Sequence, residues 1–168
     1  MCIRDRLQIG ELSDSIYTKP MAKQVEGGML LQDRNRMLLK DDMEIATKRF
    51  PEDEELDDMV FAWKIAKHIS SNGVVIAKDG AALGIGLGEV NRFWAVQKAI
   101  ERAGDKTRGA VLASDGFFPF KDSIEALADA GISSVIQPGG SVRDVEVVKE
   151  ADLNNMAMVF TGIRHFRH

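Results

Sequence analysis

The fold is decided by residues 74–87, which consist of Val74-Val75-Ile76-Ala77-Lys78, then Asp79-Gly80, then Ala81 to Leu87. The β-branched and small apolar residues of the first run are typical of a buried strand. Asp-Gly between two such runs is the strongest short signal for a β-hairpin, because a type I′ turn needs a positive φ at both central positions. The stretch therefore predicts two antiparallel strands joined by a two-residue turn.

On both sides of this hairpin, helical and extended patterns alternate. Pro51 and the acids after it predict a helix over 52–69, since proline suits the first turn and carboxylates favour the positive end of the helix dipole. Gly104 ends a second predicted helix, over 90–103. The remaining predicted elements are strands over 110–113, 133–136 and 156–160 and helices over 121–130 and 142–151. This alternation predicts an α/β layered fold with a mixed, partly parallel sheet, to which the hairpin adds an antiparallel edge.

The composition fits one folded domain and excludes several classes of protein. The chain has 168 residues, of which 45% are hydrophobic and 29% charged, and its net charge is −4. This mildly acidic balance argues against a nucleic-acid partner, and no apolar run approaches the roughly 20 residues that span a bilayer, so no membrane partner is expected. The single cysteine, Cys2, excludes an internal disulfide and a cysteine-based zinc site. A cytoplasmic location is the resulting expectation.

The beginning of the chain differs from the rest. Residues 1–24 hold scattered charge and little periodicity, and the opening Met1-Cys2-Ile3-Arg4-Asp5-Arg6 leads into no pattern. We interpret 1–24 as a leader whose first residues are not native, in a chain that begins inside a longer gene. Residues 25–168 form the predicted domain.

Glycines gather after predicted strands, at 84–88, 116 and 139–140, where ligands usually bind in open α/β sheets. The first cluster is not a dinucleotide fingerprint, because G-x-G-x-x-G requires glycine at the position of Glu89. The alternative is that these glycines let a strand pack closely against another backbone.

Two predicted loops are candidates for binding. Phe117, Phe118 and Phe120 form an aromatic cluster that either folds onto the core or walls a pocket. Asp115, just ahead of them, is a candidate turn former. Ser141 is expected as the N-cap of the next helix, and such a helix start is either an anion or polar-ligand site or only a cap.

The C-terminal residues 161–168 include two arginines, two histidines and one phenylalanine. A basic tail of this kind either binds an anionic ligand, since arginine offers a bidentate fork to phosphate, or is solvated. His68, His165 and His168 show no spacing typical of metal ligands, so no metal site is expected. No Ser-His-Asp or Cys-His arrangement is present.

Taken together, five segments resemble the C-terminal part of AICAR transformylase, in order and to the last residue. The resemblance covers residues 25–168. The segments are Ser71-Asn72-Gly73, Gly84 to Arg92, Ala113 to Asp122, Ile136 to Asp144 and Phe160 to His168. The tract 91–94 is closer to the stand-alone form of the family than to the bifunctional form that also carries IMP cyclohydrolase.

The resemblance implies transfer of a formyl group from the co-substrate 10-formyltetrahydrofolate to AICAR, giving FAICAR. It also implies a cytidine-deaminase-like fold, one half of a doubled domain, in a homodimer whose sites lie at the subunit interface. By motif, the residues that match AICAR-binding positions are Asn72, Arg92, Phe117 and Arg164, and those near the folate are Phe93, Asp122, Ser141 and Val142.

Two departures from the family limit this interpretation. Glu89 stands where the family usually has glutamine. The Lys-His pair that transfers protons in the family has no counterpart here, so no catalytic residue is assigned, apart from Asn72 as a candidate. We therefore expect this chain to be inactive alone. The alternatives are a bifunctional parent with IMP cyclohydrolase activity and a non-catalytic nucleotide- or folate-binding module.

Overall fold

The computed structural model describes residues 20–40 and 43–167 and divides into two compact units, 1–36 and 37–168. The described part of the first unit is a hairpin of β1 (Met21–Val25) and β2 (Gly28–Gln32), which pair antiparallel with every residue exposed. Most of the predicted leader, residues 1–19, lies outside the described residues.

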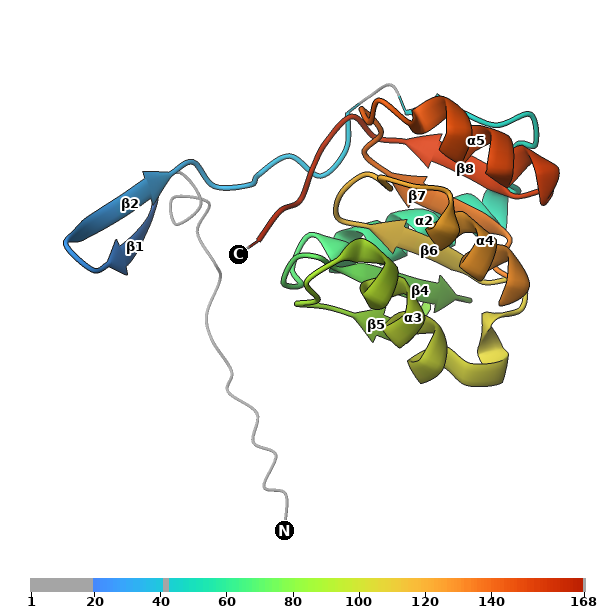
Figure 1. The fold of residues 1–168 in the computed structure, drawn as a ribbon, viewed down its shortest axis with the longest axis horizontal. Helices are drawn as coiled ribbons and strands as arrows, with labels where there is room; N and C mark the ends of the chain where they lie inside the picture. Colours follow the sequence, from blue (N-terminus) through green and yellow to red (C-terminus); the bar gives the residue numbers. More distant parts are fainter. Residues whose placement is uncertain (1–19, 41–42, 168) are drawn as a thin grey trace, which may run out of the picture. The chain divides into compact units, whose positions relative to one another are not determined.

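The second unit is built on a six-stranded sheet with the order β3-β8-β7-β6-β4-β5 (Figure 1). β6, β7 and β8 are parallel, whereas the other neighbours are antiparallel. The α/β fold class, the mixed sheet and the hairpin at one edge are therefore confirmed. The strands are β3 (Glu44–Ile45), β4 (Val74–Lys78), β5 (Ala81–Gly86), β6 (Val111–Ser114), β7 (Ser134–Gln137) and β8 (Ala157–Phe160).

Helices cover both faces of this sheet. α2 (Asp53–Ala66) packs on one face, and α3 (Arg92–Ala103), α4 (Asp122–Asp129) and α5 (Asp144–Leu153) pack on the other, with a short 3₁₀ helix at Gly104–Thr107. Successive residues of β4 point to opposite faces, so Val74 and Val75 enter different cores. A strand buried on both sides needs a continuous apolar run, which explains the composition of 74–77.

The hairpin turn has the geometry that its sequence predicts. Asp79 has a φ of 52° and Gly80 a φ of 67°, as a type I′ turn requires. Gly84 and Gly86 lie where β5 passes closest to α3, and a Cβ at either position would overlap a helix carbonyl oxygen, that of Ala99 or Ala95. The close-packing interpretation is confirmed for Gly84 and Gly86, whereas Gly88 has a positive φ of 69° and open space where a Cβ would lie.

The start of the last helix differs from the prediction. The expected helix over 142–151 begins at Asp144, and Ser141 is not its N-cap. Instead, the Asp144 carboxylate accepts hydrogen bonds from the N–H groups of Gly140 (2.7 Å) and Ser141 (3.1 Å). A side chain in the first turn thus satisfies the loop amides, and Ser141 Oγ accepts a separate bond from the Arg143 N–H (3.1 Å).

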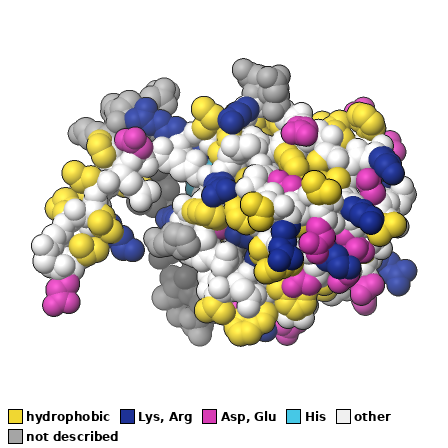
Figure 2. All heavy atoms as spheres, turned by 45° about the horizontal axis from the view of Figure 1, so that its top comes forward, with side chains coloured by type: hydrophobic (Ala, Val, Ile, Leu, Met, Phe, Trp, Pro, Cys, Tyr) yellow, Lys and Arg dark blue, Asp and Glu magenta, His cyan; other side chains and the backbone are white. Residues whose placement is uncertain are grey.

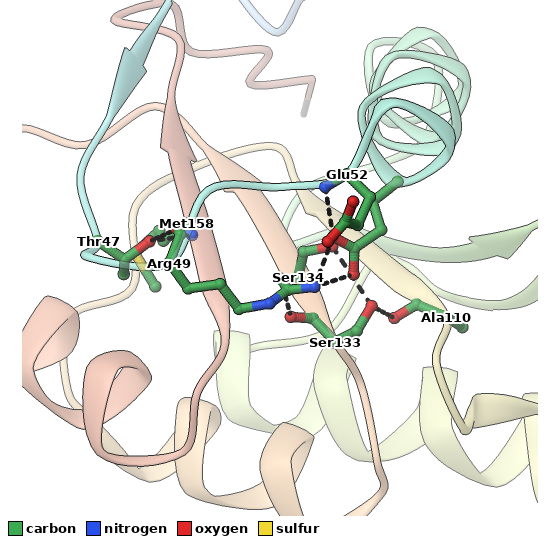
Figure 3. Close-up of polar contacts among 8 residues, drawn as sticks. Thr47, Arg49, Glu52, Ala110, Ser133, Ser134 and Met158 are labelled. Atoms are coloured by element: carbon green, nitrogen blue, oxygen red, sulfur yellow. Dashed lines mark hydrogen bonds and ion pairs between the residues drawn. The ribbon is translucent and has the colours of Figure 1, made fainter.

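A polar cluster fastens the chain to the amino ends of the parallel strands (Figure 3). Arg49 donates to Glu55 (2.8 Å) and to the Ser133 carbonyl (3.3 Å), while Glu55 also accepts from the Glu52 N–H (2.9 Å). Burial raises the pKa of Glu55, but hydrogen bonds from Ser133 and Glu52 and the nearby Arg49 outweigh burial and lower that pKa.

Basic and acidic side chains are intermixed on the face shown in Figure 2. Two of the surface ion pairs are Lys121–Glu125 (2.6 Å) and Arg143–Glu146 (3.5 Å). Across the part of the chain that the structure describes, no helix combines the length and apolar character needed to cross a membrane.

Candidate functional site

The predicted site residues come from loops and helix starts at one edge of the sheet. β6, β7 and β8 run parallel and end at this edge, while β4, antiparallel to β6, begins there. The register pairs Val74 with both Ser114 and Gly86, so β5 ends at the same edge. In open α/β sheets the carboxyl ends of the strands are the usual ligand-binding edge.

A pocket of about 430 Å³ opens between these loops. Arg164 places its guanidinium 4.8 Å above the ring of Phe117, a cation–π contact, and Ser141 and Val142 form another wall. Four of the predicted residues are thus brought together. The full lining is Phe117, Pro119, Phe120, Gly140, Ser141, Val142, Arg143 and Arg164.

The phenylalanine cluster divides between the two roles that the sequence left open. Phe118 is fully buried in the core, and its N–H donates to the buried side-chain oxygen of Gln137 (3.0 Å). Phe117 and Phe120 line the pocket, and Arg143 lies 4.7 Å above the Phe120 ring. The buried Phe118 ring therefore fixes the loop that carries the half-buried Phe117 ring and the exposed Phe120 ring.

Asn72 and Arg92 lie in a second cluster, around a buried carboxylate. Arg92 donates to Asp115 (2.5 Å), Ser114 Oγ (2.8 Å) and the side-chain oxygen of Asn72 (3.1 Å). Asp115 is completely buried and Arg92 is 6% exposed. The sequence suggested only a turn role for Asp115, and the one signal for more was its place directly after a buried strand.

Phe93 and Asp122 lie on helix starts at the same edge, outside the pocket lining. Phe93 is half-buried in the first turn of α3. Asp122 begins α4, and its Oδ1 accepts a bond from the Ser123 N–H (2.7 Å). This bond uses one of the two oxygens of the Asp122 carboxylate.

Residues 161–167 are docked on the domain through their backbone, so this described segment is not a free solvated tail. His165 is fully buried, and its ring lies 4.5 Å from that of Trp63. The backbone N–H of His165 donates to the Asp115 carbonyl (2.9 Å). Burial, followed by the charge of Lys67, lowers the pKa of His165 to about 4. Ser71 and Arg167 exchange two further bonds of 2.9 Å each.

The sequence model of the family described as "AICARFT/IMPCHase bienzyme" matches residues 5–102 of this chain. The chain belongs to this family. Its relatives named "Bifunctional purine biosynthesis protein PurH" include those of Caldicellulosiruptor bescii, 54% identical over 158 residues, and Bacillus subtilis, 44% identical over 164 residues. These alignments cover 94% and 97% of this chain but 30% and 32% of the relatives, so the chain spans about a third of their length.

Among solved structures, the chain is similar to RibD of Acinetobacter baumannii (form 2), with a TM-score of 0.44 and 17% identity. That similarity covers 64% of this chain and 34% of RibD.

Glu89 contributes its backbone to the cluster around Asn72. The Glu89 carbonyl accepts a bond from the side-chain amide of Asn72 (2.9 Å). Because the acceptor is a backbone atom, this bond does not depend on which side chain stands at position 89. Within residues 20–40 and 43–167, no three His, Cys, Asp or Glu side chains are grouped so that they could hold a metal ion.

Proposed function

We propose that this chain is the C-terminal part of an AICAR transformylase, the enzyme that transfers a formyl group from 10-formyltetrahydrofolate to AICAR. The main support is the pocket at the carboxyl edge of the sheet, where Phe117, Ser141, Val142 and Arg164 meet. Membership of the family and the names of its relatives favour a role in purine biosynthesis. The segments at this edge that resemble AICAR transformylase favour the transformylase over the cyclohydrolase.

On the AICAR side of the proposed site, the contacts come from the Phe117 ring, the Arg164 guanidinium and the Asn72 side-chain amide. Phe117 offers a flat face for the imidazole ring, and Arg164 offers paired donors to a carboxamide oxygen or phosphate. Formyl transfer forms a bond from the AICAR amine nitrogen to the formyl carbon and breaks the bond to the folate nitrogen, which gains the proton. Asn72 uses one amide hydrogen on Glu89 and keeps the other for the developing oxyanion.

The proposed folate side consists of Phe93, Asp122, Ser141 and Val142. A carboxylate accepts the two adjacent N–H groups of a pterin edge, and this is the role we propose for Asp122. Val142 is fully exposed, so it offers apolar surface to a co-substrate without rearrangement. No metal is part of this proposal.

The wider context of the chain belongs to the same proposal. The relatives that match along nearly all of this chain are named as bifunctional proteins, which favours a bifunctional parent with IMP cyclohydrolase over the stand-alone form. We propose a cytoplasmic protein and, in the full-length parent, a homodimer. The residues for proton transfer are assigned to the rest of the parent, so this chain alone has no turnover.

Calorimetric titration of the chain with AICAR, and separately with 10-formyltetrahydrofolate, tests the proposal. We expect both to bind, and Phe117→Ala or Arg164→Ala to weaken AICAR binding about tenfold or more, because each removes a contact worth at least about 1.4 kcal/mol. Phe50→Ala is the matched control, since this ring is 67% exposed and precedes α2 near the opposite edge of the sheet. Absence of AICAR binding, or equal weakening by Phe50→Ala, would refute the proposal.

A further inference from the structure

Residues 161–167, here called the C-terminal strap, lie along the site edge and are tied to three loops. Thr161 N–H donates to the Gln137 carbonyl (2.9 Å) and Gly162 N–H to the Pro138 carbonyl (3.0 Å). Farther along, the strap bonds to the loops that hold Asp115 and Ser71. It is therefore a seated segment, and Arg164 is presented from its middle.

One carboxylate connects this strap to the arginine on α3. Asp115 accepts from Arg92 through Oδ1 (2.5 Å) and from the Ser71 hydroxyl through Oδ2 (2.5 Å). The Ser71 hydroxyl in turn accepts from the Arg167 N–H (2.9 Å), and the Asp115 carbonyl accepts from the His165 N–H (2.9 Å). Both the side chain and the backbone of Asp115 thus hold the strap.

Arg92 and the C-terminal strap also approach each other closely, on either side of Gly116. A Cβ built on Gly116 would lie 2.5 Å from Arg92 Nη2 and 2.5 Å from the Phe166 ring. Arg92 and the strap therefore approach the same backbone position, and a displacement of either changes the space available to the other.

We propose that Asp115 is a positioning residue that couples Arg92 to the seating of the C-terminal strap, and hence to the position of Arg164 over Phe117. A buried guanidinium needs its carboxylate partner, so Asp115 cannot be neutralised without disturbing Arg92. A shift of Asp115 would also displace Arg167, which is bonded to Asp115 through the Ser71 hydroxyl. It would displace His165 as well, whose backbone N–H is bonded to the Asp115 carbonyl. The strap is seated when this network is complete.

The coupling is tested first without any ligand, in a Trp94→Phe background where Trp63 is the remaining tryptophan. The Trp63 ring contacts the His165 ring at 4.5 Å between centroids, so its emission reports whether the strap is in place. Carboxypeptidase digestion followed by mass spectrometry measures how fast Phe166 and His165 are released. We expect Asp115→Asn to speed this release at least tenfold and to shift Trp63 emission to longer wavelength, with the far-ultraviolet circular dichroism unchanged.

Two further variants keep the result interpretable. Glu55→Gln is the matched control, because it breaks a half-buried carboxylate–arginine pair at the opposite edge of the sheet. Ser71→Ala removes only the hydroxyl bridge and leaves the Arg92–Asp115 pair, so it tests the coupling if Asp115→Asn does not fold; we expect release about threefold faster. Unchanged release in folded Asp115→Asn or in Ser71→Ala, or equally fast release in Glu55→Gln, overturns the proposal.

The last arm rests on the proposed function and is separable from it. If AICAR binds at Arg164, linkage requires that saturating AICAR slow the release of the strap and that Asp115→Asn weaken AICAR binding. Binding of AICAR to the unmodified chain without slower release overturns the coupling. If AICAR does not bind the unmodified chain, the proposed function fails, and the ligand-free measurements alone decide the role of Asp115.

Discussion

Acidification is expected to destabilise this chain through one buried histidine. His165 is fully buried and its pKa is lowered to about 4, chiefly by burial and then by Lys67 and His68, while the Leu38 carbonyl and Asp115 act in the opposite direction. In the unfolded chain the imidazole has its ordinary pKa of 6.5. The difference between the folded-state and unfolded-state pKa values, at about 1.4 kcal/mol for each unit, corresponds to about 3 kcal/mol of folding free energy.

The sign follows from which state binds the proton first. Between pH 6.5 and 4 the unfolded chain is protonated at His165 and the folded chain is not, so protons favour unfolding. The stabilisation is fully present above pH 6.5, is lost as the pH falls to 4, and changes no further below that. About 2 kcal/mol of the loss falls between pH 6.5 and 5, above the range in which ordinary carboxylates titrate.

Urea unfolding at a series of pH values from 7.5 to 4.5, followed by tryptophan emission, measures this loss. His165→Phe keeps a ring against Trp63 and removes the titrating group, so its free energy of unfolding should vary less with pH by about 2 kcal/mol between pH 6.5 and 5. His68→Gln removes an exposed imidazole that is the weakest of the causes lowering the pKa of His165, so most of the pH dependence of the original chain should remain. Equal slopes in the original chain and in His165→Phe would refute the reasoning.

Two further predictions concern the packing of the sheet and its opposite edge. Gly86→Ala places a methyl group against the Ala95 carbonyl and should destabilise the fold by about 2 kcal/mol or more, measured as a lower thermal midpoint; an unchanged midpoint would contradict the close approach of β5 to α3. Glu55→Gln should cost about 1–2 kcal/mol near neutral pH in urea unfolding, because the Arg49 pair is half-buried. Since the pKa of Glu55 is lowered, that difference should disappear as the pH falls through the folded-state pKa, and a difference that persists at pH 2 would exclude the ion pair as its source.

The elements that sequence predicted best are those whose signals are local. Asp79-Gly80 needs only its own backbone to form the turn, and Gly104 ends α3 with a positive φ of 56° by the same kind of local preference. Ser141 shows the limit of such signals, because a serine before a helix and an aspartate within its first turn offer alternative caps. The structure uses Asp144, which reaches two loop amides at once.

The site could be predicted only in part, because its partners are far apart in sequence. The resemblance selected Phe117 and Arg164, and the structure places the Arg164 guanidinium over the Phe117 ring. The bond that the His165 backbone N–H donates to the Asp115 carbonyl and the contact of His165 with Trp63 depend on strand order, which no local pattern specifies. A sequence shows that a tail is basic, but it does not show which core residue anchors that tail.

The two arginines assigned by motif differ in how their charges are compensated, and this separates their roles. Arg92 is buried against Asp115 and already makes three hydrogen bonds, so its charge is neutralised within the chain. Arg164 is exposed on the strap, contacts the faces of Phe117 and Phe166, and forms no ion pair with the residues that the structure describes. An uncompensated guanidinium beside an open pocket is the group that attracts an anionic ligand, whereas a compensated one fixes the loops around it. Replacing Arg164 should therefore change ligand affinity with little change in stability, and replacing Arg92 should change both.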